Sequence, residues 1–96
     1  MAVRKIKIKL TEHCKTRAFE RNITTDNIRR IINNPIETFY DAERENYKSY
    51  GLGTNPPFKE QLYLMIIHSK INTSVTVITA MWMDKGGLKV NGFSKC

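Results

Sequence analysis

The sequence predicts an α+β fold in which two N-terminal helices pack on one face of a four- to five-stranded, mainly antiparallel sheet. Apolar residues follow helical spacing early in the chain, whereas the later part is rich in β-branched and aromatic residues in strand-length runs. Turn residues separate these runs. Helices grouped before strands, rather than alternating with them, favour α+β over α/β.

A short strand and a helix are expected at the start of the chain. Residues 3–10 (VRKIKIKL) alternate apolar and basic side chains, which is the pattern of a half-buried strand. Lysines on such a strand would discourage edge-to-edge pairing at the sheet margin. Residues 10–23 (LTEHCKTRAFERNI) predict a helix capped by Thr11, with Cys14 and Ala18 on its apolar side.

A second helix is expected from a cap at Thr24 or Thr25 to about residue 33, because Pro35 disfavours helical geometry in the residue before it. The run QLYLMIIH that follows later is the most apolar, and we expect it to be central in the sheet. The expected strands after the helices cover residues 37–42, 46–52, 61–68 and 74–83, with an edge strand at 88–93.

Length and composition fit one globular domain over residues 1–96. The 41% hydrophobic and 26% charged content is ordinary for such a domain. No apolar run approaches the roughly 20 residues of a membrane span, and the N-terminus has no apolar signal segment, so we expect a cytoplasmic protein with no membrane partner. Cys14 and Cys96 lack the spacing of a zinc site. We therefore expect no metal and no cofactor.

Positive charge is concentrated near the N-terminus. Sixteen Lys and Arg against nine acidic residues give a net charge of +7, and residues 1–30 alone carry nine basic and three acidic residues. A basic region of this kind attracts polyanions through Coulomb attraction and counterion release. Nucleic acid is the leading candidate. Solubility or an acidic protein partner would also account for the charge.

The candidate site is a ridge on the first helix, which we call the His13 ridge. His13, Arg17 and Arg21 are spaced four residues apart, so their side chains are neighbours on a helix surface. One group that titrates near neutrality beside two permanent cations suits an anionic ligand such as phosphate. The plainer interpretation is that the arginines are solvated and that the histidine only caps or packs.

A longer pattern covers nearly the whole chain. It comprises His13, Arg17, Arg21 and Ile23, then Ile28, Ile31 and the Asn34-Pro35 stop, and then residues 47–51 and 75–79. This pattern resembles a small uncharacterised prokaryotic domain family that opens with H-A-x-x-R-…-R-x-I. That family is considered similar to RelE/ParE-type toxins and to the barnase–EndoU–colicin–RelE ribonuclease group. The resemblance implies a single RelE-like α+β domain.

The resemblance also implies a toxin-type, metal-independent endoribonuclease that is inhibited by an antitoxin or immunity protein. Such an enzyme needs a base for the 2′-hydroxyl proton, cations for the phosphorane and an acid for the leaving 5′-oxygen. His13 is the candidate base or acid, and Arg17 and Arg21 are expected to hold the scissile phosphate. From the sheet we expect a catalytic contribution from Tyr47 and substrate binding by Lys48, Tyr50 and Thr79.

These sheet residues also have structural interpretations. Tyr47 and Tyr50 are three apart on a strand and so alternate faces, which places one of them in the core. Lys48 is a candidate for simple solvation, and Thr79 for an ordinary strand residue. His68 is an alternative catalytic histidine, although histidines at strand ends commonly bond backbone carbonyls.

Two other functions remain open. The first is a nucleic-acid-binding module without catalysis, which would use the same basic residues. The second is a protein-interaction domain centred on an exposed segment at residues 81–83. Within that segment Trp82 could stack on a base, although a core or interface position is the commoner outcome for tryptophan.

Overall fold

The computed structural model describes residues 7–54, 56–57, 59, 62–71 and 73–95, and it has the predicted α+β architecture. The elements are β1 (Lys7–Leu10), α1 (Glu12–Glu20), α2 (Thr25–Asn33), β2 (Glu37–Asp41), β3 (Asn46–Leu52), β4 (Tyr63–Ile71), β5 (Ser74–Met83) and α3 (Lys85–Val90).

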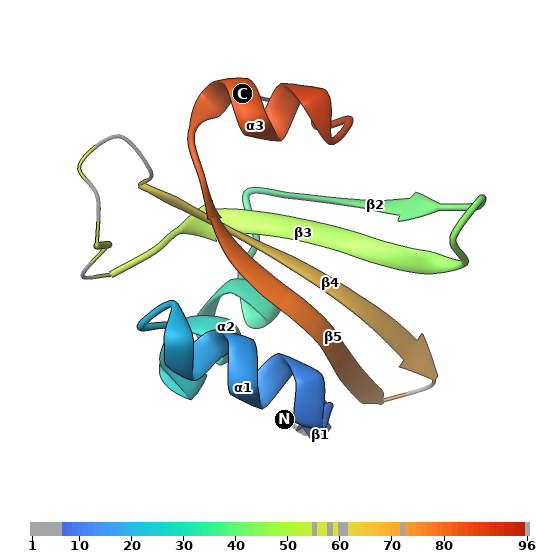
Figure 1. Ribbon diagram of the computed structural model, residues 1–96. Helices are drawn as coiled ribbons and strands as arrows, with labels where there is room; N and C mark the ends of the chain where they lie inside the picture. The colour runs from blue at the N-terminus through green and yellow to red at the C-terminus, as the bar shows by residue number, and fades with distance from the viewer. Residues whose placement is uncertain (1–6, 55, 58, 60–61, 72, 96) are drawn as a thin grey trace, which may run out of the picture.

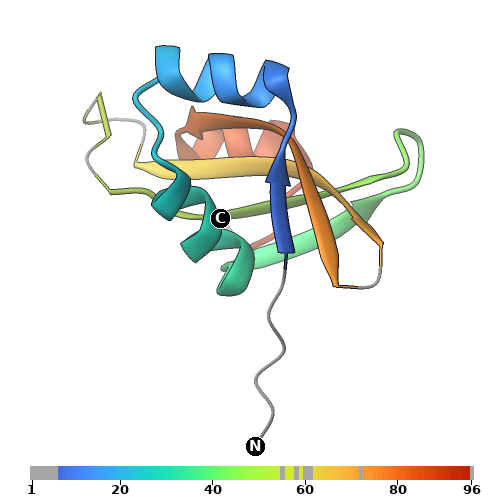
Figure 2. The same cartoon turned by 90° about the horizontal axis from the view of Figure 1, so that it is seen from below.

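One mixed sheet forms the middle layer, with strand order β1-β5-β4-β3-β2. Strand β1 runs parallel to β5, and the other three pairs are antiparallel. Helices α1 and α2 lie on one side of the sheet and α3 on the other (Figure 1). In Figure 2, which looks from the side of α1 and α2, α3 is seen behind the sheet. We call these the α1/α2 face and the α3 face.

The N-terminal elements begin where the sequence indicates. Strand β1 confirms the described part of the predicted strand, whose residues 3–6 lie outside the described residues. The Thr11 hydroxyl accepts a hydrogen bond from the Cys14 amide at 3.1 Å, and the Thr24 hydroxyl accepts one from the Asn27 amide at 3.2 Å. Both are N-caps. Asn22, at φ 58°, makes the turn between the helices in a left-handed conformation that asparagine tolerates.

A hydrophobic core lies on each face of the sheet. Cys14 lies in the core between the sheet and the helices α1 and α2, as predicted. That core comprises Cys14, Ala18, Ile23, Ile28, Ile31, Leu64, Ile66, Val75, Val77, Ala80 and Trp82. The core on the α3 face comprises Tyr50, Met65, Leu88 and Phe93. Strand β4 contributes to both cores and is central, as expected from its apolar run.

The predicted edge strand at 88–93 is wrong, because its first half belongs to α3 and the rest is turn and coil. The Asp84 carboxylate accepts a hydrogen bond from the Gly87 amide at 2.7 Å and caps the helix. Leu88 and Phe93 then pack into the core of the α3 face. Gly92 follows the helix at φ 101°, a conformation that favours glycine. Strand β1, not this segment, is therefore the sheet edge next to β5.

No helix in the described ranges is long and apolar enough to cross a membrane.

Candidate functional site

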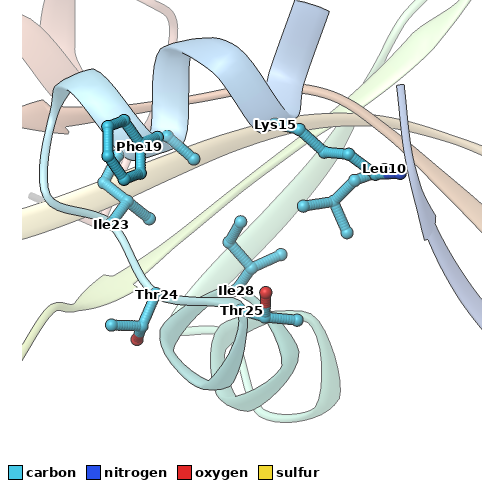
Figure 3. Close-up of a pocket in the computed structure, with 8 residues that line it drawn as sticks. Leu10, Lys15, Phe19, Ile23, Thr24, Thr25 and Ile28 are labelled. Carbon is cyan, nitrogen blue, oxygen red and sulfur yellow. The ribbon is translucent and has the colours of Figure 1, made fainter. Parts of the chain in front are cut away.

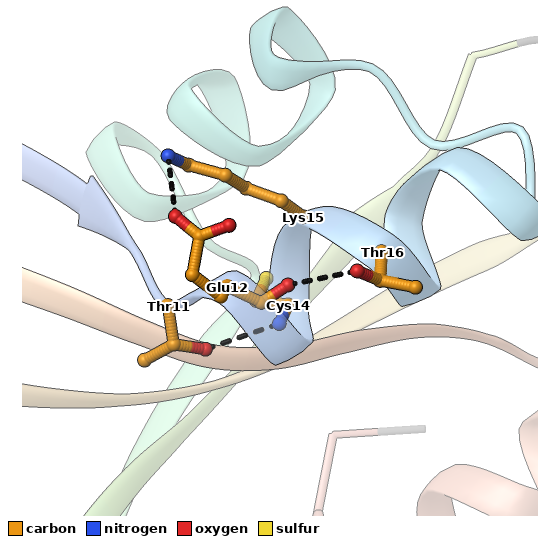
Figure 4. A network of polar contacts seen from close by, with 5 residues as sticks. All are labelled: Thr11, Glu12, Cys14, Lys15 and Thr16. Atoms are coloured by element: carbon orange, nitrogen blue, oxygen red, sulfur yellow. Dashed lines mark hydrogen bonds and ion pairs between the residues drawn. The ribbon is translucent and has the colours of Figure 1, made fainter.

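Helix α1 is fixed to β5 beyond the point where β1 stops pairing. Strand β1 pairs with β5 only along Ser74–Val77. Past it, the Thr11 hydroxyl donates to the Ile78 carbonyl oxygen at 3.4 Å. Figure 4 shows the first turn of α1, where Lys15 and Glu12 form an exposed ion pair of 3.3 Å. The Thr16 hydroxyl also donates to the Glu12 carbonyl oxygen at 3.1 Å. Thr11 thus joins the start of α1 to β5, while the other two contacts lie within the helix.

Two members of the His13 ridge remain accessible. The His13 side chain is exposed, and no hydrogen bond or ion pair joins it to another side chain or to the backbone in the described part of the chain. Arg17 forms an ion pair of 3.2 Å with Glu20, and both side chains stay about half exposed. An ion pair this exposed is weak and can exchange for another anion. His13 and Arg17 therefore form an open, cationic flank of α1.

Arg21, in contrast, makes structural hydrogen bonds to β5. Its Nη1 donates to the Ala80 carbonyl oxygen of β5 at 2.8 Å. Its own carbonyl oxygen accepts a hydrogen bond from the Trp82 Nε1 at 2.8 Å. Arg21 closes α1 as its C-cap, so these contacts fix the end of the helix to the sheet. The ridge thus presents one histidine and one arginine at the surface, not the three expected groups.

Three predicted substrate-binding residues lie on the α3 face. Tyr50 is 1% exposed and belongs to the core under α3. Lys48 forms an ion pair of 3.5 Å with Asp41 and lies over the Phe39 ring. Thr79 is directly opposite Ile67, which packs against the same core, and opposite residues share a face. Lys48, Tyr50 and Thr79, which were expected to bind substrate, therefore lie on the opposite side of the sheet from α1, because strand alternation directs them there.

Trp82 lies in the core, as its structural interpretation predicted. It is 7% exposed and packs beneath α1. Met81 and Met83, on either side, are partly buried against the core of the α3 face. The expected exposed apolar segment at 81–83 is therefore wrong, and the protein-interaction hypothesis loses the surface on which it was based.

Tyr47 is on the α1/α2 face and lines a polar pocket near the last turn of α2. It stacks on His68, with ring centroids 5.8 Å apart and planes 15° from parallel. The cavity measures about 170 Å³, and we call it the His68 pocket. Its lining residues are Ile32, Thr38, Tyr47, Ser49, His68, Lys70 and Val75.

A chain of hydrogen bonds orients His68 in this pocket. The hydroxyls of Thr38 and Ser49 share a hydrogen bond of 2.7 Å, and Ser49 Oγ lies 2.8 Å from His68 Nε2. The other ring nitrogen, Nδ1, is buried and has no hydrogen-bond partner in the described ranges. Burial, reinforced by the positive charge of Lys70, lowers the pKa of His68 to about 4. The ring is therefore neutral at pH 7.

The sequence alone did not single out Thr38, Ser49 or Lys70. A signal was present for Ser49, because it shares a strand face with Tyr47 two residues earlier. The other two depend on strand register, since Thr38 in β2 is opposite Ser49 in β3, and Lys70 in β4 is opposite Val75 in β5. His68, the alternative catalytic histidine, is therefore held by a cross-strand hydroxyl chain, not by a backbone carbonyl.

A second hollow lies between α1 and α2 (Figure 3). Its volume is about 270 Å³, and Leu10, Ile23 and Ile28 supply apolar walls. Phe19, 88% exposed, stands at the rim. Lys15 is the charged residue that lines it, and its ammonium is paired with Glu12. Thr24 and Thr25 add hydroxyl groups to the lining, and no histidine, cysteine or carboxylate is among its described lining residues.

Among the described residues, no three His, Cys, Asp or Glu side chains gather closely enough to hold a metal ion.

Comparison with known families gives one match. The family model for a domain of unknown function, DUF4258, matches residues 10–82, which include α1, α2 and β2 to β4 and all but the last residue of β5. No curated protein and no solved structure matches the chain.

Proposed function

We propose that this chain, which belongs to the DUF4258 family, is a toxin-type, metal-independent endoribonuclease that uses the His13 flank of α1. One observation carries the proposal: an exposed imidazole lies one helical turn from an exposed arginine, in the most basic part of the chain. Arginine suits the geometry of phosphate oxygens, and histidine can take or give a proton near neutral pH.

The chemistry assigns one role to each group. The 2′-oxygen of RNA attacks the adjacent phosphorus while His13 accepts the 2′-hydroxyl proton. The bond from phosphorus to the 5′-oxygen breaks, and the leaving 5′-oxygen takes a proton from water, which leaves a 2′,3′-cyclic phosphate and a 5′-hydroxyl end. Arg17 exchanges Glu20 for the phosphate and stabilises the charge on its oxygens. Arg21 acts as a positioning residue, because its contacts hold the end of α1 on β5.

The second candidate function is RNA binding without cleavage. One observation that favours it is the hydrogen bond from Arg21 to the Ala80 carbonyl oxygen, which occupies the guanidinium. Another is that the three expected substrate-binding residues of the sheet lie on the α3 face. With these residues elsewhere, the His13 flank has one proton-transfer group and no identified acid for the leaving oxygen. The same cations would still bind phosphates without regard to sequence.

We also propose a cytoplasmic protein inhibitor, in the manner of an antitoxin or immunity protein. An acidic surface on that inhibitor would complement His13, Arg17 and the neighbouring lysines of β1. Expression of the chain alone is expected to arrest growth, and co-expression of the neighbouring reading frame to restore it. Harmless expression of the folded chain would contradict this part of the proposal.

The nuclease proposal is tested with purified protein, end-labelled RNA and excess EDTA. We expect fragments that carry 2′,3′-cyclic phosphate and 5′-hydroxyl ends. Intact RNA together with binding that weakens steeply as salt rises would overturn cleavage and establish the binding module. Intact RNA without binding would overturn both functions.

A further inference from the structure

The His68 pocket is not used by the reaction proposed for the His13 flank. It has a fixed polar interior, since Thr38, Ser49 and His68 form a hydrogen-bonded chain. His68 is 5% exposed, yet its Nδ1 has no partner within the described ranges. An unpaired polar atom in a buried position is costly and uncommon in folded proteins. A ligand that completes the hydrogen bonding of this ring would remove that cost.

We propose that the His68 pocket binds the base of a nucleotide, with the phosphate group held at Lys70. The cavity of about 170 Å³ is smaller than the roughly 300–1,000 Å³ of pockets for drug-sized molecules, so it accepts a ring system and little more. Ile32 and Val75 supply apolar walls, and Tyr47 supplies an aromatic one. Flat, partly apolar rings with polar edges, such as nucleobases, fit this combination.

The polar groups match the edge of a base. The Thr38–Ser49 hydrogen bond can run in either direction, so the neutral His68 ring can present Nδ1 as a donor or as an acceptor. Base edges carry both ring nitrogens that accept and amino groups that donate. A base edge that reaches the buried Nδ1 can therefore pair with it whichever tautomer His68 adopts.

Lys70 supplies the charge for the phosphate. It lines the pocket, its side chain is exposed, and its ammonium lies close enough to His68 to disfavour a positive charge on that ring. A lysine ammonium is a compact charge that suits phosphate oxygens. The choice of a nucleotide over another flat anion rests on the proposed function. The hydrogen-bonded polar interior of the pocket is observed independently of that function.

The test is an NMR titration of the whole chain with adenosine 5′-monophosphate and uridine 5′-monophosphate, with adenosine and inorganic phosphate as separate probes. We expect at least one nucleotide to shift the imidazole signals of His68 and the amide signal of Ser49 saturably at millimolar concentration. Adenosine should bind more weakly than its monophosphate. Phosphate alone should leave the His68 imidazole signals in place.

Lys70→Gln supplies the matched variant, because its side chain is exposed and the fold does not depend on it. It is expected to weaken the binding of adenosine 5′-monophosphate by roughly 2- to 5-fold and to leave adenosine unchanged. Lys89→Gln, at an exposed position of α3, should change the binding of neither ligand. Thr38→Val should weaken both ligands, because it removes the hydroxyl that orients Ser49.

Three results would overturn the inference: no saturable change at His68 with either nucleotide, equal changes with phosphate alone, or a high-resolution structure in which only a water occupies the pocket in the presence of nucleotide. RNA cleavage by the same preparation separates this inference from the proposed function. Nucleotide binding without cleavage would overturn the nuclease and keep the pocket, whereas cleavage without pocket binding would do the reverse.

Discussion

Arg21 and Trp82 tie α1 to β5 in both directions. The Trp82 indole donates to the Arg21 carbonyl oxygen at 2.8 Å, while the Arg21 guanidinium donates to the carbonyl oxygen of Ala80, two residues before Trp82, also at 2.8 Å. The guanidinium that the sequence assigned to phosphate therefore has a structural role. Its contribution should be measurable as stability, apart from any contribution to activity.

Replacing Arg21 by alanine should lower the free energy of unfolding by about 1–3 kcal/mol, because a charged hydrogen bond to a half-buried carbonyl is lost. Urea unfolding followed by Trp82 fluorescence measures the change. Arg29→Ala is the matched control, since Arg29 is exposed on α2, and it should stay within about 0.5 kcal/mol of the parent chain. Equal stabilities of the two variants would show that the tie contributes nothing.

Gly53 lies against the ring of Trp82. A Cβ at this position would be 2.1 Å from Trp82 Cζ3, which is far inside van der Waals contact. Gly53→Ala should therefore destabilise the fold by about 1–3 kcal/mol, as overpacking commonly does. Gly86→Ala is the matched control, because its Cβ would meet nothing closer than Asp84 Oδ1 at 3.6 Å and should add up to about 1 kcal/mol in α3. The opposite order of stabilities would contradict the packing described.

The free energy of unfolding should decrease as the pH is lowered, because of the titration of His68. Its pKa is lowered from 6.5 to about 4 in the folded chain. Between these values the unfolded chain binds the proton and the folded chain does not, so acid favours unfolding. The loss should approach about 3 kcal/mol by pH 4. It is measured by urea unfolding between pH 7 and pH 4.

The variant His68→Gln isolates this contribution from that of the carboxylates. It keeps a polar group near Ser49 and removes the titrating ring, so its stability should depend less steeply on pH than that of the parent chain. Parallel pH profiles for His68→Gln and the parent would show that His68 titrates normally.

Most of the fold follows from local signals in the sequence. The capping residues Thr11 and Thr24 placed the first two helices. The runs of β-branched and aromatic residues on either side of Tyr50 placed the central strands of the sheet. Helix α3 was missed because its first turn contains two glycines, which indicate a turn. The signals that identify it, Asp84 as a cap and Gly92 after the end, flank the segment instead.

The candidate site was harder to predict because it depends on register. Strand alternation predicted that Tyr47 and Tyr50 separate to opposite faces, and Tyr50 is the core residue. The position of His68 depends on an irregularity, since the partner in β5 changes from Thr79 opposite Ile67 to Val77 opposite His68. Such a shift arises from pairing between strands and leaves no local mark in the sequence.

The central claim is that His13 transfers the proton in RNA cleavage, and the cleavage rate of His13→Gln in EDTA tests it most directly. The variant should retain the circular dichroism spectrum and unfolding midpoint of the parent chain, because His13 is exposed and unpartnered in the described structure. Its cleavage rate should fall by about 10²- to 10⁴-fold. A folded His13→Gln protein that cleaves RNA at the parent rate would contradict the account.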